Sequence, residues 1–279
     1  MYRVSMETGM TIREHIEELR TRTLHIAISI IVITIFCMSF GLKPFEYFDM
    51  QLAYPFPDPI NNIAVNITHY MQKTLLPQEV RLIQTAPGQA FFAQLNVAVM
   101  LGVLGSLPVI VVEISHFVSP AIGKRSQRSI GKILISIFTL FSAGIIFSYL
   151  IVIPFTLDFL YRYGQAIGVE TFLNINDFIG FVMQFFIGFG LAFQLPIIMY
   201  VLSISEVISP RFWRNNLRYA IIAIAIFGAA ITPDGSGITM WFVAGPMIGL
   251  YLVGMLIVER RAKRAETEEY QNNNKLQQQ

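Results

Sequence analysis

The sequence has little charge and a single cysteine. Asp, Glu, Lys and Arg make up 14% of its 279 residues, whereas about 25% is typical of soluble domains. The lone thiol, Cys37, excludes a disulfide framework and a zinc site built from paired cysteines. A formal net charge of only +2 provides no broad basic surface, so the composition argues against nucleic-acid binding.

Residue patterns that indicate catalysis are also missing. The four histidines never form a metal-ligand pair at helical spacing, and His15-Ile16-Glu17-Glu18 is not the HExxH zinc motif. No intramembrane Asp pair or Ser/Lys pair suggests a protease. We therefore predict a protein that is not an enzyme and that needs no cofactor or metal.

Apolar residues are abundant and lie in long runs. They make up 54% of the chain, and the mean hydropathy is +0.57. A membrane-spanning helix needs about 20 mostly apolar residues, and charged or Pro/Gly-rich breaks separate six apolar runs. The sequence therefore predicts an all-α integral membrane protein with six transmembrane helices, at residues 23–42, 89–117, 133–153, 178–202, 219–232 and 238–258.

The distribution of Lys and Arg predicts how these helices are oriented. An even number of crossings places both termini on one side, and short cytoplasmic segments are enriched in Lys and Arg. The N-terminal segment and the second-to-third connection contain four each, the fourth-to-fifth connection three and the tail five. Both termini are therefore predicted to be cytoplasmic, and the opposite side has only Lys43, Lys73, Arg81 and Arg162.

The fifth run is short for a membrane span. Residues 219–232 would rise only about 21 Å as a helix, against about 30 Å of hydrocarbon. Either the membrane thins or is wetted near Thr232, Pro233 and Asp234, or residues 215–218 extend the helix and snorkel. Both alternatives place a thinned or wetted region beside this helix.

The remaining segments have distinct compositions. The outer connection, 43–88, contains six prolines among apolar residues, which predicts an ordered cap of short helices. Asn66-Ile67-Thr68 on this connection is a glycosylation sequon, a tripeptide that often arises by chance. Residues 1–260 are predicted to form one membrane domain, followed by a disordered cytoplasmic tail at 261–279 that is rich in Gln and Asn.

Residues 10–22 are typical of an amphipathic helix. Thr11 and Glu14 have the spacing of a capping box, and apolar residues follow one stripe. Glu18 can pair with Arg22 four residues later. From these residues alone, the segment is a salt-bridged surface helix.

Polar groups within the predicted spans are costly and are candidates for function, and we single out two of them, Glu113 and Gln194. Glu113 shares a helix face with Phe117 at the cytoplasmic end of the second span, where it could also be a snorkelling carboxylate. Gln194 lies in the middle of the fourth span, where an amide could simply join two helices. Pro196 is predicted to kink that helix and free a carbonyl.

Four motifs, in order along the chain, resemble the TatC family of twin-arginine translocase subunits. Residues 15–22 are similar to the HLxELRxR opening of the family, and residues 107–122 to its second span with the FxxPaL exit. Residues 189–196 resemble the FGxAFExP motif, and residues 232–234 the TPPD turn. The resemblance covers about residues 10 to 260.

This resemblance implies a fold and a function. The family fold is a cupped six-helix bundle with short fifth and sixth helices. Its members bind the twin-arginine signal peptides of folded precursor proteins at the cytoplasmic face of the plasma membrane of prokaryotes. With single-span partners of the TatA/TatB type, in larger complexes with several copies, they export these precursors using the proton-motive force.

The resemblance also implies which residues bind. Glu18 matches the N-terminal acidic residue of the family and Phe117 the aromatic residue that helps line the peptide site. A carboxylate in a partly desolvated site suits a guanidinium ligand because charge-assisted bidentate bonds are strong there. The peptide site is further expected to include Leu19, Arg20 and Pro120, and the intramembrane partner contact to include Gln194, Pro196, Pro233 and Asp234.

The chain departs from the family at two positions. Where members often have an acidic residue after the FxxPaL motif, this chain has Ser126 in a wholly basic loop. Our hypothesis is that Glu113 substitutes for that acid, since it lies one helical turn from Phe117. The second departure, Gln194 where many members have Glu, argues against a proton relay at that position.

Two other classes of protein are alternatives. A structural scaffold for single-span partners would share the grooves of the family but would not need Glu18. A small-solute or ion transporter would need midplane charges, inverted repeats or paired broken helices, and only residues 190–196 suggest a broken helix.

Overall fold

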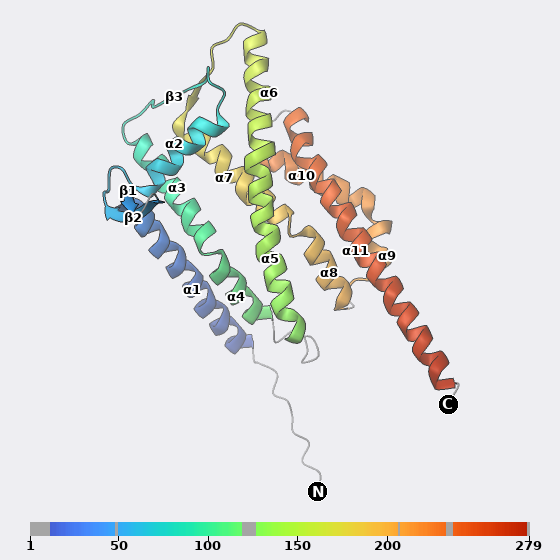
Figure 1. Ribbon diagram of the computed structural model, residues 1–279. Helices are drawn as coiled ribbons and strands as arrows, with labels where there is room; N and C mark the ends of the chain where they lie inside the picture. Colours follow the sequence, from blue (N-terminus) through green and yellow to red (C-terminus); the bar gives the residue numbers. More distant parts are fainter. Residues whose placement is uncertain (1–11, 48–49, 119–126, 206, 233–236, 278–279) are drawn as a thin grey trace. The chain divides into compact units, whose positions relative to one another are not determined.

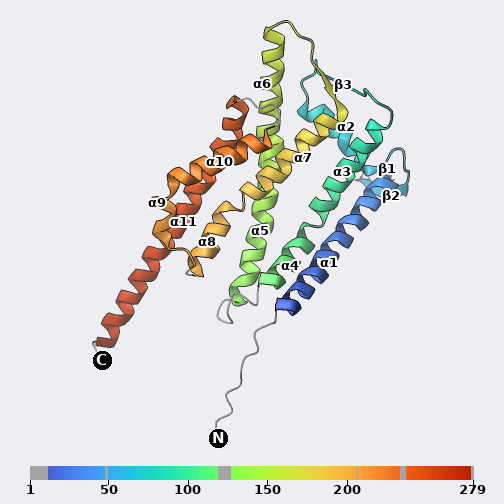
Figure 2. The same cartoon turned by 180° about the vertical axis from the view of Figure 1, so that it is seen from behind.

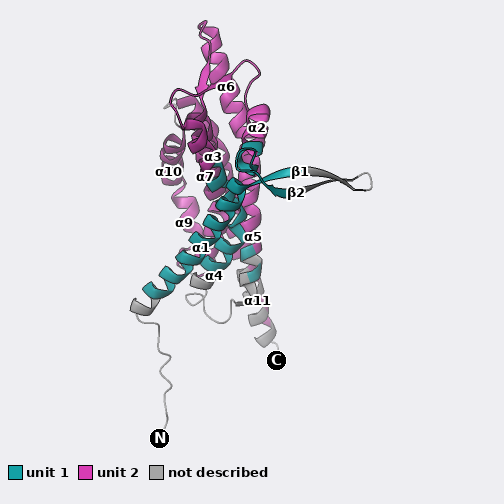
Figure 3. Ribbon diagram, turned by 90° about the vertical axis from the view of Figure 1, so that its left-hand side faces the viewer, with its two compact units in different colours: residues 1–66, 97–134 teal, residues 67–96, 135–279 magenta. Residues whose placement is uncertain are grey.

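The computed structural model describes residues 12–47, 50–118, 127–205, 207–232 and 237–277, and this part of the chain is mostly helical (Figure 1). The chain forms two compact units, one of residues 1–66 and 97–134 and the other of residues 67–96 and 135–279 (Figure 3). Some of the predicted elements differ from those observed, and each difference has a local cause in the sequence.

The first unit is built around helix α1 (Ile12–Ser39). We predicted an amphipathic segment followed by a membrane span, but the two are one continuous helix of 28 residues. No Pro or Gly interrupts this stretch, so the backbone hydrogen bonds continue from the polar end into the apolar end. Residues of the polar end are therefore held in fixed register with the span.

The prediction of an all-α protein with a helical cap was wrong for the residues that follow α1. Strands β1 (Phe40–Tyr47) and β2 (Met50–Pro57) pair antiparallel, with Phe40 opposite Pro57 and Tyr47 opposite Met50 (Figure 3). Prolines disfavour a helix here, and they are tolerated because both strands of a two-stranded ribbon are edge strands.

Helix α2 (Ile63–Leu75) begins at a side-chain cap. Asn62 accepts a hydrogen bond from the Val65 amide at 2.9 Å and donates one to the Pro59 carbonyl at 2.9 Å. Asn62 is fully buried, so these bonds satisfy polar groups that water does not reach.

The predicted span at 89–117 is a bent pair of helices, α3 (Gln89–Gly105) and α4 (Leu107–Val118). Their axes differ by 51°. Pro108 has no N–H and interrupts the ladder of hydrogen bonds at this bend. Buried Ser106, between the helices, accepts a hydrogen bond from the Ser29 hydroxyl of α1 at 2.9 Å.

Two further helical segments differ in length or continuity from the predicted runs. Helix α5 (Gln127–Phe147) continues through a π-turn, η3 (Ser148–Val152), into α6 (Ile153–Ala166), so the helix extends well beyond residue 153. Helices α7 (Ile175–Ala192) and α8 (Leu195–Ile204) are separated by Phe193 and Gln194, just before Pro196, which was predicted to kink this span. Strands β3 (Arg81–Ile83) and β4 (Phe172–Asn174) pair in parallel.

Phenylalanines of α7 form the centre of the second unit. Phe178, Phe185 and Phe189 are fully buried, and Phe185 stacks on Phe189 with ring centroids 6.2 Å apart. Gly144 of α5 lies against the backbone of α7, where an added Cβ would come within 2.5 Å of the Phe189 carbonyl oxygen. Small residues thus allow close packing of apolar helices.

The last three helices are α9 (Pro210–Asn215), α10 (Leu217–Ile231) and α11 (Gly237–Gln277), and α11 contacts α8, α9 and α10 (Figure 2). Helix α10 has 15 residues, which agrees with a short fifth run. Helix α11 has 41 residues, so the predictions of a short sixth helix and a disordered tail were wrong. The tail is rich in Ala, Glu, Lys, Arg and Gln, which favour helix.

Four helical segments are long and apolar enough to cross a membrane, and the bent pair α3–α4 brings the number to as many as five. The four are Ile16–Ser39, Leu134–Ala166, Ile175–Ile204 and Gly237–Arg264. The described residues therefore define a mostly helical membrane protein, in which α10 is apolar but short.

Candidate functional site

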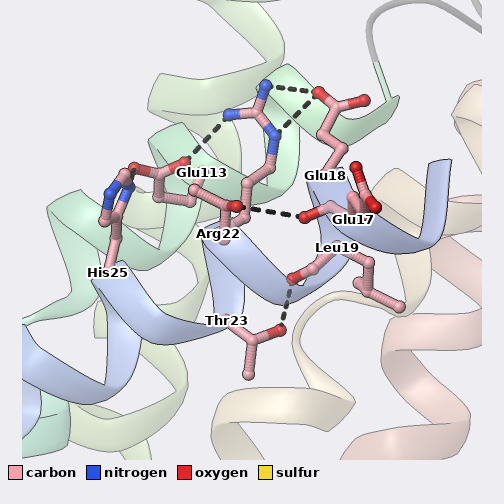
Figure 4. A network of polar contacts seen from close by, with 8 residues as sticks. Glu17, Glu18, Leu19, Arg22, Thr23, His25 and Glu113 are labelled. Atoms are coloured by element: carbon pink, nitrogen blue, oxygen red, sulfur yellow. Dashed lines mark hydrogen bonds and ion pairs between the residues drawn. The ribbon is translucent and has the colours of Figure 1, made fainter. Parts of the chain in front are cut away.

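A network of charged and polar residues joins α1 to α4 within the first unit (Figure 4). Glu18, Arg22 and His25 come from α1, where spacings of four and three residues place them on one face. Glu113 comes from α4, the partner of α1 in packing. Figure 4 shows the four side chains directed toward one another.

Arg22 bridges the two carboxylates. Its Nε and Nη2 atoms both donate to Oε1 of Glu18, at 2.9 and 2.5 Å. Its Nη1 atom donates to Oε2 of Glu113 at 2.9 Å, and the other oxygen of Glu113 lies 2.9 Å from His25 Nδ1. One guanidinium thus holds two carboxylates from two helices.

Three members of the network are largely shielded from water, whereas the side chain of His25 is 56% exposed. The side chains of Glu18, Arg22 and Glu113 are 18%, 22% and 16% exposed. Oε2 of Glu18 is buried and has no hydrogen-bond partner. Charge-assisted bonds are stronger at such sites than in water, and a buried carboxylate oxygen without a donor is costly.

A hollow of about 530 Å³ opens on this network and is lined by Glu17, Glu18, Thr21, Arg22, His25 and Glu113. Three carboxylates and one guanidinium line it, and these four groups have a net charge of −2. Such a hollow favours a cationic ligand that donates several hydrogen bonds. No group of three or more His, Cys, Asp or Glu side chains in the described residues could hold a metal.

The structure brings together two of the predicted peptide-site residues, Glu18 and Glu113. Leu19 and Arg20 are exposed on α1 and do not line the hollow. The backbone of Phe117 belongs to α4, but its side chain lies outside the described part of the chain. Four further predicted positions also lie outside the described residues: Pro120, Ser126, Pro233 and Asp234.

Sequence reasoning missed Arg22 and His25 as members of the site. Arg22 had been paired with Glu18 as part of a surface helix, and no role had been given to His25. The helical spacing of Glu18, Arg22 and His25 could have indicated the site, because it places a carboxylate, a guanidinium and an imidazole on one face of the helix.

The predicted intramembrane residues lie in the second unit. Nε2 of Gln194 donates to the carbonyls of Ile137 and Gly190 at 3.2 and 3.4 Å, so this amide joins α5 to the α7–α8 break. Its Oε1 atom is buried and has no partner. Pro196 is buried in the first turn of α8.

Taken together, the fold and the site define a class: a membrane protein with several apolar helices and a partly buried acidic site between two of them. The family model described as Sec-independent protein translocase protein (TatC) matches residues 14–246. The chain belongs to this TatC family, which makes it a component of Sec-independent protein transport and not an enzyme. The four sequence motifs had predicted this membership, and that prediction is confirmed.

Individual relatives support the same assignment. The chain is 48% identical over 259 residues to the TatC protein of Cenarchaeum symbiosum, covering 92% of this chain and 98% of that protein. It is 30% identical to the chloroplastic TATC of Arabidopsis thaliana, covering 90% and 66% of the two chains. A crystal structure of the twin-arginine translocase receptor TatC superposes with a TM-score of 0.72 at 26% identity, covering 88% of this chain and 98% of that chain.

Proposed function

We propose that this chain is the signal-peptide receptor of its translocase and that Glu18 and Glu113 bind the arginines of a twin-arginine signal peptide. The observation that supports this site is the bridge made by Arg22, because it demonstrates that the two carboxylates are spaced to share a guanidinium. Glu113 thereby takes the role of the acid that is absent at Ser126.

The chemistry of the site favours arginine over lysine. A guanidinium donates from three nitrogen atoms in one plane, so it can reach both carboxylates at once. An ammonium donates from a single atom and leaves more of the four carboxylate oxygens without a donor. The partial burial of both carboxylates makes each missing bond more costly.

Neighbouring residues complete the proposed peptide site. Phe117 follows Glu113 by one helical turn and is assigned the aromatic contact that its family motif implies. Leu19 and Arg20, both exposed on α1, and Pro120 are assigned to the parts of the peptide that flank its arginines.

The proposed topology has six crossings with both termini in the cytoplasm of a prokaryotic cell. The distribution of Lys and Arg along the chain supports it. Helix α10 would be the fifth crossing, and its 15 residues, about 22 Å of helix, fit a locally thinned membrane. The hollow beside Glu18 then faces the cytoplasm, where precursors are made.

Single-span subunits of the TatA/TatB type are the proposed partners, acting with several copies of this chain and the proton-motive force. Gln194, at the break between α7 and α8, is assigned to this contact by family resemblance. Pro196 and, by family resemblance, Pro233 and Asp234 are assigned to the same region.

The test is binding of a labelled signal peptide to the purified full-length protein in lipid nanodiscs. We expect Arg-Arg peptide to bind more tightly than Lys-Lys peptide, and Glu18→Gln to weaken Arg-Arg binding by about tenfold or more, since it removes a charge-assisted pair. Asp158→Asn, which removes an equal charge from an exposed pair in the second unit, is the control. Equal binding of both peptides, with partner assembly intact, would instead indicate a scaffold.

A further inference from the structure

We infer that Arg22 occupies the place that a ligand arginine takes, so that a twin-arginine peptide binds by exchanging one of its guanidiniums for that of Arg22. This inference rests on the proposed function and adds to it a residue that sets the affinity of the site. It predicts that Arg22 opposes ligand binding, although it lies at the centre of the binding network.

The contacts of Arg22 are those expected of a bound ligand. Three of its N–H groups bond to two carboxylates, and these bonds account for one oxygen of Glu18 and one of Glu113. An incoming guanidinium has the same donors in the same plane. It can therefore re-form every bond that Arg22 gives up, which keeps the cost of exchange low.

The hollow gives the displaced side chain somewhere to go. Arg22 is 22% exposed and lines the hollow of about 530 Å³. Its flexible stem is attached to α1, so its guanidinium can swing into water while the helix stays in place. No backbone movement is required for the exchange.

A second arginine has a separate role in this scheme. Oε2 of Glu18 is buried and has no donor while Arg22 is in place. Release of Arg22 frees the Glu18 carboxylate to turn, so that one ligand guanidinium replaces Arg22 and the next supplies the missing donor. With Arg22 displaced, the three carboxylates of the hollow carry a formal charge of −3, which favours a ligand with two guanidiniums.

Exchange makes a quantitative prediction that a supporting role for Arg22 does not make. A protein whose binding-competent state is only partly populated binds every ligand more weakly by that same fraction. Removing Arg22 should therefore strengthen binding of Arg-Arg and Lys-Lys peptides by the same factor and leave their ratio unchanged. A residue that merely held the carboxylates in position would weaken binding when removed.

The experiment measures Kd for both peptides on the full-length protein in nanodiscs, at two salt concentrations, for Arg22→Gln and Arg22→Lys. We expect Arg22→Gln to tighten both by about tenfold, the change that one charged hydrogen bond produces. Arg22→Lys keeps the charge but weakens the competitor, so it should tighten both to a smaller extent. Arg260→Gln, which removes an equal charge at an exposed position of α11, controls for simple electrostatics.

Unchanged or weaker binding of the Arg-Arg peptide in Arg22→Gln overturns the inference. The inference also fails if Arg260→Gln tightens binding as much as Arg22→Gln does. If Arg22→Gln lowers the melting temperature of the protein, Arg22→Lys decides by the same criteria. Glu18→Gln in the otherwise unchanged protein separates the proposed receptor function from the exchange of Arg22. Loss of binding there, together with weaker binding in Arg22→Gln, leaves the receptor function standing and removes only the exchange.

Discussion

Glu113 illustrates how much a single residue depends on its surroundings. In the sequence it has two readings, a snorkelling carboxylate near the headgroups or a substitute for a missing acid. In the structure Glu113 bonds to both Arg22 and His25 of another helix, and its role as the substitute acid stays a prediction. The pairing of Glu18 with Arg22 was predictable from their spacing, but the distance of 91 residues between Arg22 and Glu113 has no local signal.

At the residue scale, we predict that Glu113→Lys abolishes crosslinking of a signal peptide to this site. The substitution places a second cation beside Arg22, which adds like-charge repulsion to the loss of one carboxylate. Photo-crosslinking from a probe next to the peptide arginines measures the effect. Asp158→Lys is the matched charge reversal in the second unit, and it should leave crosslinking intact.

Crosslinking that persists at full yield in Glu113→Lys would remove Glu113 from the site. Glu113 would then serve only as a contact between α4 and α1.

The helices illustrate what hydropathy does and does not specify. The apolar runs predicted the position of every long helix in the described residues. An apolar segment in a lipid bilayer has no water to bond its backbone, so it forms a helix that satisfies its own N–H and C=O groups. The ends were less predictable: α11 continues to Gln277 because its polar residues are good helix formers, a preference that hydropathy ignores. The β1–β2 ribbon was missed because the prolines of this connection predicted a cap of short helices, although edge strands accept proline.

At the element scale, we predict that Gly102→Ala destabilises the first unit. An added Cβ would lie 2.4 Å from Thr34 Oγ1 and 2.8 Å from the Ile30 carbonyl oxygen, so α1 and α3 would have to separate. Overpacking of this kind costs about 1–3 kcal/mol, which outweighs a gain of up to about 1 kcal/mol in helix propensity. Thermal unfolding in detergent should reveal a lower melting temperature.

The control is Gly131→Ala in α5, where an added Cβ meets nothing within 4 Å. Its melting temperature should stay the same or rise. Equal behaviour of the two variants would contradict the close packing of α1 against α3.

For the whole molecule, membership of the TatC family was predictable from four motifs spread along the chain. The family model matches residues 14–246, a range that includes all four motifs. The number of crossings and their direction rest on a different signal, the asymmetry of Lys and Arg. Family resemblance alone also suggested a short sixth helix, which this chain does not have.

At this scale, we predict that residues 165 and 209 lie on opposite sides of the membrane, with residue 209 in the cytoplasm. The buried Cys37 is the only cysteine, so Cys37→Ala provides a background for single-cysteine variants. In intact cells, a membrane-impermeant maleimide should label Gln165→Cys and not Ser209→Cys. Labelling of both, or the reverse pattern, would contradict the proposed topology.

A double-mutant cycle between receptor and ligand tests the central claim most directly. Affinities are measured for wild type and Glu113→Gln, each with the Arg-Arg peptide and with peptides in which one arginine is replaced by glutamine. If Glu113 binds a ligand arginine, at least one of the two positions should have a coupling free energy above about 1 kcal/mol. If the effects of Glu113→Gln and of each peptide replacement on the binding free energy add to within about 0.5 kcal/mol for both arginines, Glu113 does not contact the signal peptide.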